Sequence, residues 1–116
     1  MSIFTQLFGS VESIHVSDLQ EKISGKQRPM LIDVRTMSEY REGHIPGASS
    51  FPLDRLEGRL NKLSKSKEII CICRSGSRSK RATRILQKAG FNAINMQGGM
   101  NAWQKAGYKT KAGKVK

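Results

Sequence analysis

A cysteine, two arginines and a glycine gather within six residues of this 116-residue sequence. The segment Ile-Ile-Cys-Ile-Cys-Arg-Ser-Gly-Ser-Arg-Ser places Cys73 after an apolar run and ahead of Arg74 and Arg78. We expect the backbone N–H groups of residues 73–78 to curl around an anion at the start of a helix, with Gly76 permitting the turn. The same positive field lowers the pKa of a thiol. The pattern therefore predicts a nucleophilic thiolate at Cys73, whereas an inert structural cysteine would have apolar surroundings.

The elements that must position this loop alternate between short apolar runs and amphipathic stretches, which indicates a parallel sheet covered by helices. Helices are expected after three caps with Gln or Glu three residues later, at Ser17, Thr36 and Asp54. Two further helices are expected over residues 79–89 and 101–106, and the strands over residues 14–16, 30–34, 48–51, 68–73 and 92–96. Cys73 then lies at the carboxyl end of a buried strand, where open parallel sheets bind ligands.

The charge is unevenly distributed along the chain. The formal net charge is +12, yet residues 1–54 carry 5 basic and 7 acidic residues, while residues 55–116 carry 16 basic and 2 acidic residues. No acidic residue follows Glu68. This asymmetry points to an anionic partner and leaves open a small anion, a nucleic acid or a membrane surface.

The two cysteines are expected to be reduced. Cys71 and Cys73 are separated by one residue, so they share a strand face but are too close in sequence for an unstrained disulfide. Reduced thiols favour a cytoplasmic setting, and the sequence shows neither a membrane span nor a secretory leader. His15 and His44 lack metal-ligand spacing to each other or to the cysteines, so no metal site is expected.

Five motifs in register give the chain a resemblance to the single-domain rhodaneses, or thiosulfate sulfurtransferases. They are Leu-Ile-Asp-Val-Arg at 31–35, Glu-Tyr at 39–40, Gly-His-Ile-Pro-Gly-Ala at 43–48, Cys-Arg-Ser-Gly-Ser-Arg-Ser at 73–79 and Gly-Gly-Met-Asn-Ala-Trp at 98–103. The resemblance covers residues 12–108, which leaves an N-terminal extension at 1–11 and a basic tail at 109–116 that we expect to be mobile. It implies an α/β fold with a five-stranded parallel sheet flanked by helices on both faces.

The resemblance also implies a two-step sulfur transfer without a cofactor. Cys73 would take the outer sulfur of thiosulfate as a persulfide and pass it to a thiol, or to cyanide in an assay. The residues expected to bind the anionic substrate are Arg74, Ser75, Gly76, Ser77 and Arg78. Phosphatases of similar fold place five residues between cysteine and arginine, whereas four separate Cys73 from Arg78.

A non-catalytic or carrier module that relays sulfur, or binds an acidic protein or tRNA, is the alternative function. A basic run at Lys80, Arg81, Arg84 and Lys88 raises the nucleic-acid interpretation, although a solvated helix face that adds positive potential near the site is favoured. With few aromatic residues, no base-stacking platform is evident. We expect no membrane contact and a monomer or weak homodimer, with the apolar N-terminal residues 3–8 packing on the domain or a second copy.

Several residues outside the loop have two interpretations. Asp33 and Arg35 could act directly at the site, but an internal ion pair bracing the neighbouring loops is favoured. Glu39 is expected to cap its helix, and His44 to make a structural hydrogen bond. The glycines at 98–99 either let their loop approach the cysteine loop or form a plain turn.

Overall fold

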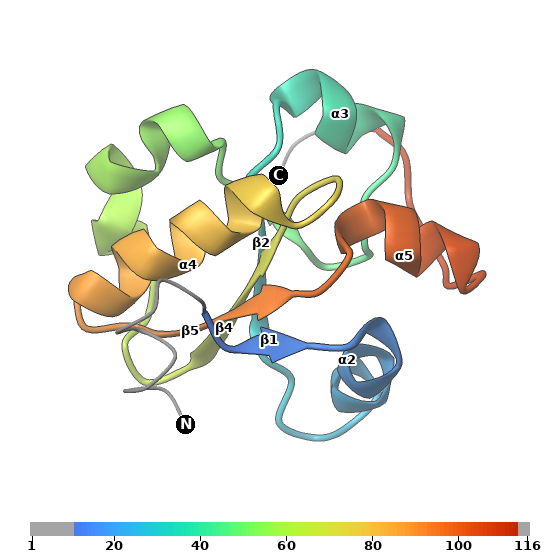
Figure 1. The fold of residues 1–116 in the computed structure, drawn as a ribbon, viewed down its shortest axis with the longest axis horizontal. Helices are drawn as coiled ribbons and strands as arrows, with labels where there is room; N and C mark the ends of the chain where they lie inside the picture. Colours follow the sequence, from blue (N-terminus) through green and yellow to red (C-terminus); the bar gives the residue numbers. More distant parts are fainter. Residues whose placement is uncertain (1–10, 114–116) are drawn as a thin grey trace.

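Five parallel strands form one sheet in the computed structural model, which describes residues 11–113 (Figure 1). The strands are β1 (Ser13–Ile14), β2 (Met30–Asp33), β3 (Ser49–Ser50), β4 (Glu68–Ile72) and β5 (Asn92–Met96). Their order in the sheet is β1-β5-β4-β2-β3, so β4 is the central strand. The predicted α/β class and five-stranded parallel sheet are confirmed.

Helices cover both faces of the sheet. α4 (Ser77–Lys88) and the 3-10 helix η1 (Leu53–Lys62) pack on one face, while α2 (Val16–Ile23) and α5 (Gly99–Lys105) pack on the other. β4 is buried on both sides, because Ile69 and Cys71 contribute to the first core and Ile70 and Ile72 to the second. This two-sided burial explains why the strand is a continuous apolar run.

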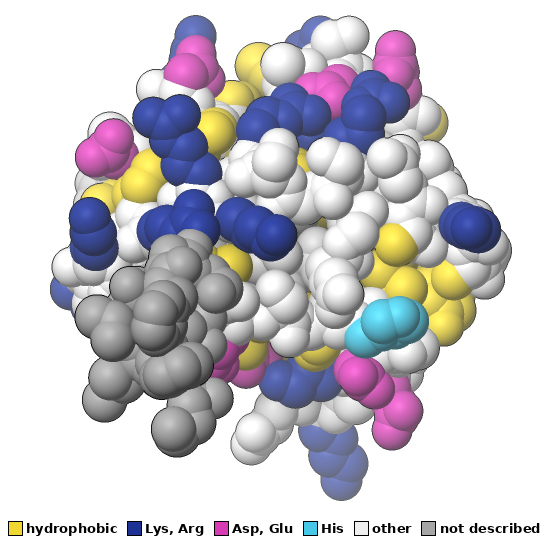
Figure 2. Space-filling model, in the orientation of Figure 1, with side chains coloured by type: hydrophobic (Ala, Val, Ile, Leu, Met, Phe, Trp, Pro, Cys, Tyr) yellow, Lys and Arg dark blue, Asp and Glu magenta, His cyan; other side chains and the backbone are white. Residues whose placement is uncertain are grey.

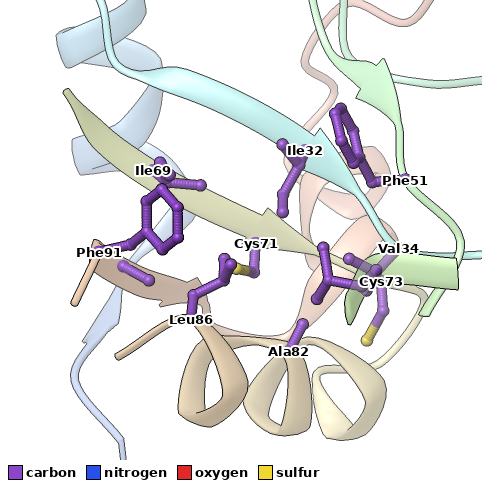
Figure 3. Close-up of a cluster of buried hydrophobic side chains, with 11 residues drawn as sticks. Ile32, Val34, Phe51, Ile69, Cys71, Cys73, Ala82, Leu86 and Phe91 are labelled. Atoms are coloured by element: carbon purple, nitrogen blue, oxygen red, sulfur yellow. The ribbon is translucent and has the colours of Figure 1, made fainter. Parts of the chain in front are cut away.

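Figure 3 shows the core between the sheet and α4, in which the side chains of Cys71 and Cys73 point toward that helix. Cys71 packs with Leu86 inside this core, and Cys73 lies at its end. Both cysteines are free thiols, as the sequence predicted. The strand alternation thus places both thiols on one face, with Cys71 in the interior and Cys73 at the edge of the core.

One of the three predicted helix caps is present. The Thr36 side chain accepts from the N–H of Glu39, and the Glu39 carboxylate accepts from the N–H of Thr36, which together open α3 (Met37–Glu42). The Ser17 cap is wrong: because β1 ends at Ile14, His15 becomes the cap and its Nδ1 accepts the N–H of Ser17 at 3.3 Å. The Asp54 cap is also wrong, because η1 begins after Pro52 without a side-chain cap.

The helix starts around the site differ from the predicted ones by two residues. α4 begins at Ser77 rather than at residue 79, and α5 at Gly99 rather than at residue 101. Both are preceded by glycines in the left-handed region, Gly76 at φ +114° and Gly98 at φ +78°. Glycine adopts this region readily, so each helix can start directly after its tight turn.

The described part of the basic tail is hydrogen-bonded to the end of α3 and the turn after it. His44 and Lys111 exchange backbone N–H···O bonds of 2.9 and 2.8 Å, and the N–H of Gly113 donates to Arg41 at 3.0 Å. The apolar run at residues 3–8 and the last three residues lie outside the described range. Within residues 11–113, no helix has the length and apolar character needed to cross a membrane.

Candidate active site

Cys73 directly follows the central strand, at the carboxyl end of the sheet. Only 1% of the residue is exposed, and Gly76 turns the chain into α4 three residues later. The predicted strand, loop and helix are therefore present. The backbone of the loop and the first turn of α4 surround the position of the sulfur.

Hydrogen bonds hold the Cys73 sulfur. The N–H of Gly76 donates to Sγ at 3.0 Å, and Ser79 Oγ lies 3.2 Å from it. Burial is the largest influence on the pKa of Cys73 and raises it, but hydrogen bonds from the Ser79 hydroxyl and from the N–H groups of Ser79, Gly76 and Ser75 together lower the pKa below the ordinary value. Hydrogen bonds to the charged form favour a thiolate.

We expect the alkylation of Cys73 by neutral iodoacetamide to follow this lowered pKa. The alkylation rate is measured by intact mass between pH 5 and 10. Because only the thiolate reacts, we expect the rate to rise with pH, and the midpoint of the rise to lie below the ordinary pKa of a cysteine thiol. Cys71 stays unlabelled, since burial raises its pKa to about 12. A midpoint equal to that of free cysteine, or two labels on the folded protein, would contradict the assignment of Cys73 as the reactive thiol.

The start of α5 braces the cysteine loop from the other side. The N–H of Met100 donates to the carbonyl of Cys73 at 2.8 Å, and the N–H of Asn101 to that of Arg74 at 3.0 Å. A Cβ atom at Gly99 would lie far inside van der Waals contact with both carbonyl groups. Of the two interpretations for the glycines at 98–99, the close approach to the cysteine loop is the one present.

The two loop arginines share one carboxylate. Arg78 donates from Nη1 and Nη2 to the two oxygens of Glu39, at 2.7 and 2.9 Å, and Arg74 Nε donates to Oε2 at 3.2 Å. The side-chain hydrogen bond from Arg78 holds the pKa of Glu39 well below its usual range. Glu39 therefore has a second role beyond the predicted cap, and it orients both arginines that were expected to bind substrate.

Asp33 and Arg35 form the buried ion pair that the sequence favoured. Arg35 Nη2 lies 2.7 Å from Asp33 Oδ2 and donates to the carbonyl of Gly43 at 2.8 Å. This arginine therefore ties the end of β2 to the end of α3. His44 Nδ1 donates to the carbonyl of Tyr40, 2.7 Å away, and its ring stacks on the Tyr40 ring, which is the structural role expected for His44.

Two fully buried polar residues near the sulfur were not identified from the sequence. Ser79 Oγ lies 2.5 Å from Asn95 Oδ1, and Asn95 Nδ2 donates to Ser13 Oγ at 3.1 Å. Ser79 looked like the start of a helix, and Asn95 like one polar residue within an apolar strand. A polar side chain at a core position of β5 is the one signal that could have indicated Asn95.

The two loop serines lie at the surface, and their role in binding substrate stays a prediction. Ser75 and Ser77 are exposed on either side of the buried Gly76.

A cleft of about 420 Å³ opens beside Arg78. The residues that line it include Arg35, Thr36, Leu53, Asp54, Arg78 and Arg81. Within residues 11–113, no group of three or more His, Cys, Asp and Glu side chains could hold a metal ion.

Known proteins resemble this chain in sequence and in fold. Residues 15–106 match the family model described as Rhodanese-like domain. The chain is 38% identical over 95 residues to "Putative sulfur carrier protein YrkF" of Bacillus subtilis, with 81% of this chain covered but only 51% of YrkF. It is also 38% identical over 94 residues to "Thiosulfate sulfurtransferase 16, chloroplastic" of Arabidopsis thaliana, covering 70% of this chain and 78% of that protein.

A solved structure extends the similarity to the backbone. The crystal structure of a rhodanese-related protein from Thermoplasma volcanium matches with a TM-score of 0.81 and 30% identity. The match covers 86% of this chain and 97% of the other. The fold of the described residues is thus shared over nearly the whole length of that protein.

Proposed function

The chain belongs to the rhodanese-like domain family, and from that premise we propose that it is a sulfurtransferase whose Cys73 carries sulfane sulfur as a persulfide. The supporting observation is the environment of Sγ, which lies in a cradle of N–H groups and the Ser79 hydroxyl at the start of α4. These donors stabilise a sulfur anion without a general base.

In the first step, the Cys73 thiolate attacks the outer sulfur of thiosulfate. A bond forms between Sγ and that sulfur, while the bond to the sulfonate sulfur breaks and its electron pair leaves with sulfite. In the second step, a nucleophilic acceptor such as cyanide or a thiolate attacks the terminal sulfur, and Cys73 leaves as a thiolate. Neither step needs an oxidant or a reductant.

No histidine is needed as a base, because the hydrogen bonds at Sγ already favour the thiolate. Both histidines of the chain have other hydrogen bonds: His15 caps α2, and His44 bonds the carbonyl of Tyr40. Arg74 and Arg78 supply the positive charge that attracts thiosulfate and holds the sulfite as it forms.

Phosphatase chemistry is the weaker alternative at this site. A phosphatase needs an acid to protonate the leaving alcohol, and the carboxylate that is hydrogen-bonded to the loop arginines is Glu39. Because Arg78 holds the pKa of Glu39 so low, this carboxylate is ionised at neutral pH and has no proton to give. The four-residue spacing between Cys73 and Arg78 also differs from the five-residue spacing of the related phosphatases.

The test compares the two chemistries on one preparation of the protein. With thiosulfate and cyanide we expect thiocyanate to form catalytically, and with p-nitrophenyl phosphate we expect no release of nitrophenol above the uncatalysed rate. The reverse result would replace sulfur transfer with phosphate hydrolysis. Turnover of neither substrate would favour the carrier alternative.

We further infer that the exposed face of α4 binds an acidic protein that exchanges sulfur with Cys73. Figure 2 shows Lys and Arg side chains gathered over α4. Lys80, Arg81 and Lys88 are exposed, and none of the three forms an ion pair within residues 11–113. The helix carries no acidic residue in its first turn.

This charge pattern opposes the stability of the helix. Cations near a helix N-terminus repel the positive end of its dipole, and like charges three or four residues apart repel each other by a few tenths of a kcal/mol per pair. An acidic partner would relieve both effects at the end of α4 that holds Cys73. A protein is favoured over RNA because the sequence has one Trp, two Tyr and four Phe, which is poor for a base-stacking platform.

A pair of synthetic cysteine peptides tests this surface. One peptide has six glutamates beside its cysteine and the other has six glutamines. Each is offered as the sulfur acceptor to protein that has been treated with thiosulfate. At low salt we expect roughly tenfold faster transfer to the acidic peptide. We expect the faster transfer to the acidic peptide to be lost in Lys80→Glu/Arg81→Glu and kept in Lys105→Glu/Lys109→Glu. The second double variant changes the net charge by the same amount, but at the end of α5 and just beyond it.

Equal losses in the two double variants would assign the preference to net charge alone and overturn the α4 surface. Retention of tRNA by the wild-type protein at 150 mM salt, without any preference for the acidic peptide, would replace the acidic protein with RNA. Thiocyanate formation from thiosulfate and cyanide in each variant shows whether sulfur transfer itself is intact.

A further inference from the structure

A chain of hydrogen-bonding groups runs from the Cys73 sulfur through the interior to the first strand. Sγ lies 3.2 Å from Ser79 Oγ, which lies 2.5 Å from Asn95 Oδ1. The amide nitrogen of Asn95 donates to Ser13 Oγ at 3.1 Å, and Ser13 Oγ donates to the carbonyl of Val11 at 3.4 Å. Ser79 and Asn95 are fully buried, while Ser13 is exposed at the edge strand.

The number of protons on these groups decides in which direction their hydrogen bonds are donated. Ser79 has one hydroxyl proton, and three acceptors surround it: the carbonyl of Gly76 at 3.1 Å, Asn95 Oδ1 and the Cys73 sulfur. When the proton points to Asn95, the Cys73 thiol can donate to Ser79 Oγ. Every bond of the chain then points away from the sulfur, which is the arrangement of a neutral thiol.

A Cys73 thiolate needs the opposite arrangement. The anion has no proton to donate, so Ser79 stabilises it only by turning its hydroxyl proton toward Sγ. That turn leaves Ser79 Oγ and Asn95 Oδ1 facing each other with no proton between them. Rotation of the amide by half a turn relieves the repulsion, because Nδ2 then donates to Ser79 and Oδ1 accepts from the Ser13 hydroxyl.

We propose that Asn95 is a positioning residue that reverses this hydrogen-bond chain when Cys73 loses its proton, so that the buried sulfur anion receives a hydroxyl donor. The thiol proton leaves to solvent, and the chain itself neither gains nor loses a proton. An amide suits the position because it has a donor and an acceptor on one planar group. A carbonyl or an ammonium at the same point could serve only one direction.

The position of Asn95 in the sheet fits this role. β5 pairs with β4 so that Asn95 lies beside Cys71, two residues before the reacting cysteine. Burial of an amide costs free energy unless both of its ends are hydrogen-bonded, and here Ser79 and Ser13 satisfy them. A bond that supports an anion is about twice as strong as a neutral one, so loss of Asn95 disfavours the thiolate more than the thiol.

Other ionisable groups lie around the cysteine loop and are the same in all the variants. They are Cys71 on β4, Asp33 and Arg35 after β2, Glu39 on α3, and Arg74 and Arg78 in the loop and the first turn of α4. None of them contacts Asn95 through a hydrogen bond within residues 11–113. A change in the pKa of Cys73 on substitution of Asn95 therefore reports on the chain through Ser79.

The pH dependence of Cys73 alkylation tests the proposal in a double-mutant cycle. The proteins are the wild type, Ser79→Ala, Asn95→Leu and Ser79→Ala/Asn95→Leu, each treated with iodoacetamide and weighed intact. We expect the pKa of Cys73 to rise by about one in Ser79→Ala and by about half as much in Asn95→Leu. In the Ser79→Ala background, Asn95→Leu adds nothing, because the group through which Asn95 acts is gone.

An unchanged pKa in Asn95→Leu, or an equal rise in both backgrounds, would overturn the proposal. Thermal unfolding of each variant separates a lost fold from a lost hydrogen bond. Asn95→Ala, with the same expected rise, replaces Asn95→Leu if the larger side chain prevents folding. The inference rests on the proposed role of Cys73, but alkylation needs no sulfur donor, so a failure of sulfur transfer would leave this result unchanged.

Discussion

Replacement of Gly99 with alanine is expected to destabilise the protein by about 3–5 kcal/mol and to lower sulfur transfer roughly 100-fold. A Cβ atom here would collide with the carbonyl groups of Cys73 and Arg74, which are backbone and have little room to move. Gly99 also has φ +59°, a region that L residues occupy at a cost. The collision would displace the loop that carries Cys73. Urea unfolding measures the first effect and thiocyanate formation the second.

Gly107→Ala is the matched control for this substitution. Gly107 has φ +79°, but its added Cβ would meet nothing within 4 Å. We therefore expect about 1 kcal/mol of destabilisation from the backbone alone, with sulfur transfer unchanged. If Gly99→Ala behaved like Gly107→Ala, the packing of α5 against the cysteine loop would not position the site.

Replacement of Arg78 with alanine is expected to lower kcat/KM for thiosulfate by about 100-fold or more. Two losses combine: a cation beside the site disappears, and the Glu39 carboxylate loses its two-point partner. The uncompensated carboxylate repels thiosulfate and disfavours the Cys73 thiolate. Arg74→Ala should have a smaller effect, because Arg74 contributes one 3.2 Å bond and 56% of its side chain is exposed.

Glu39→Gln separates the two losses. This variant removes the carboxylate and keeps Arg78, so we expect a much smaller loss of kcat/KM than in Arg78→Ala. The double variant Glu39→Gln/Arg78→Ala should recover part of the activity that Arg78→Ala loses, since no unpaired carboxylate is left. Equal kinetics in Arg78→Ala and Arg74→Ala would contradict the assignment of Arg78 as the principal substrate-binding cation.

The local part of the site could be predicted from the sequence. The apolar run before Cys73 indicates a strand buried on both faces, and the glycine and the amphipathic helix after it indicate a loop that opens toward an anion. These signals extend over fewer than 20 residues and depend on backbone geometry. The Asp33–Arg35 pair, two residues apart, could be predicted for the same reason.

The long-range part could not be predicted. Glu39 and Arg78 are 39 residues apart, and Ser79 and Asn95 are 16 apart, so only the packed sheet brings each pair together. The strand pattern also could not show that β1 ends at Ile14, because that end is set by its pairing with β5. His15 thereby became a helix cap, where the local sequence favoured Ser17.

The intact mass of the protein after incubation with thiosulfate tests the central claim most directly. We expect the wild type to gain one sulfur atom and to lose it on addition of cyanide. The Cys73→Ser variant should gain none. Cys71→Ser, the matched control on the same strand face, should still gain the sulfur. An unchanged mass of the folded wild type, or a gain that survives Cys73→Ser, would contradict a persulfide on Cys73.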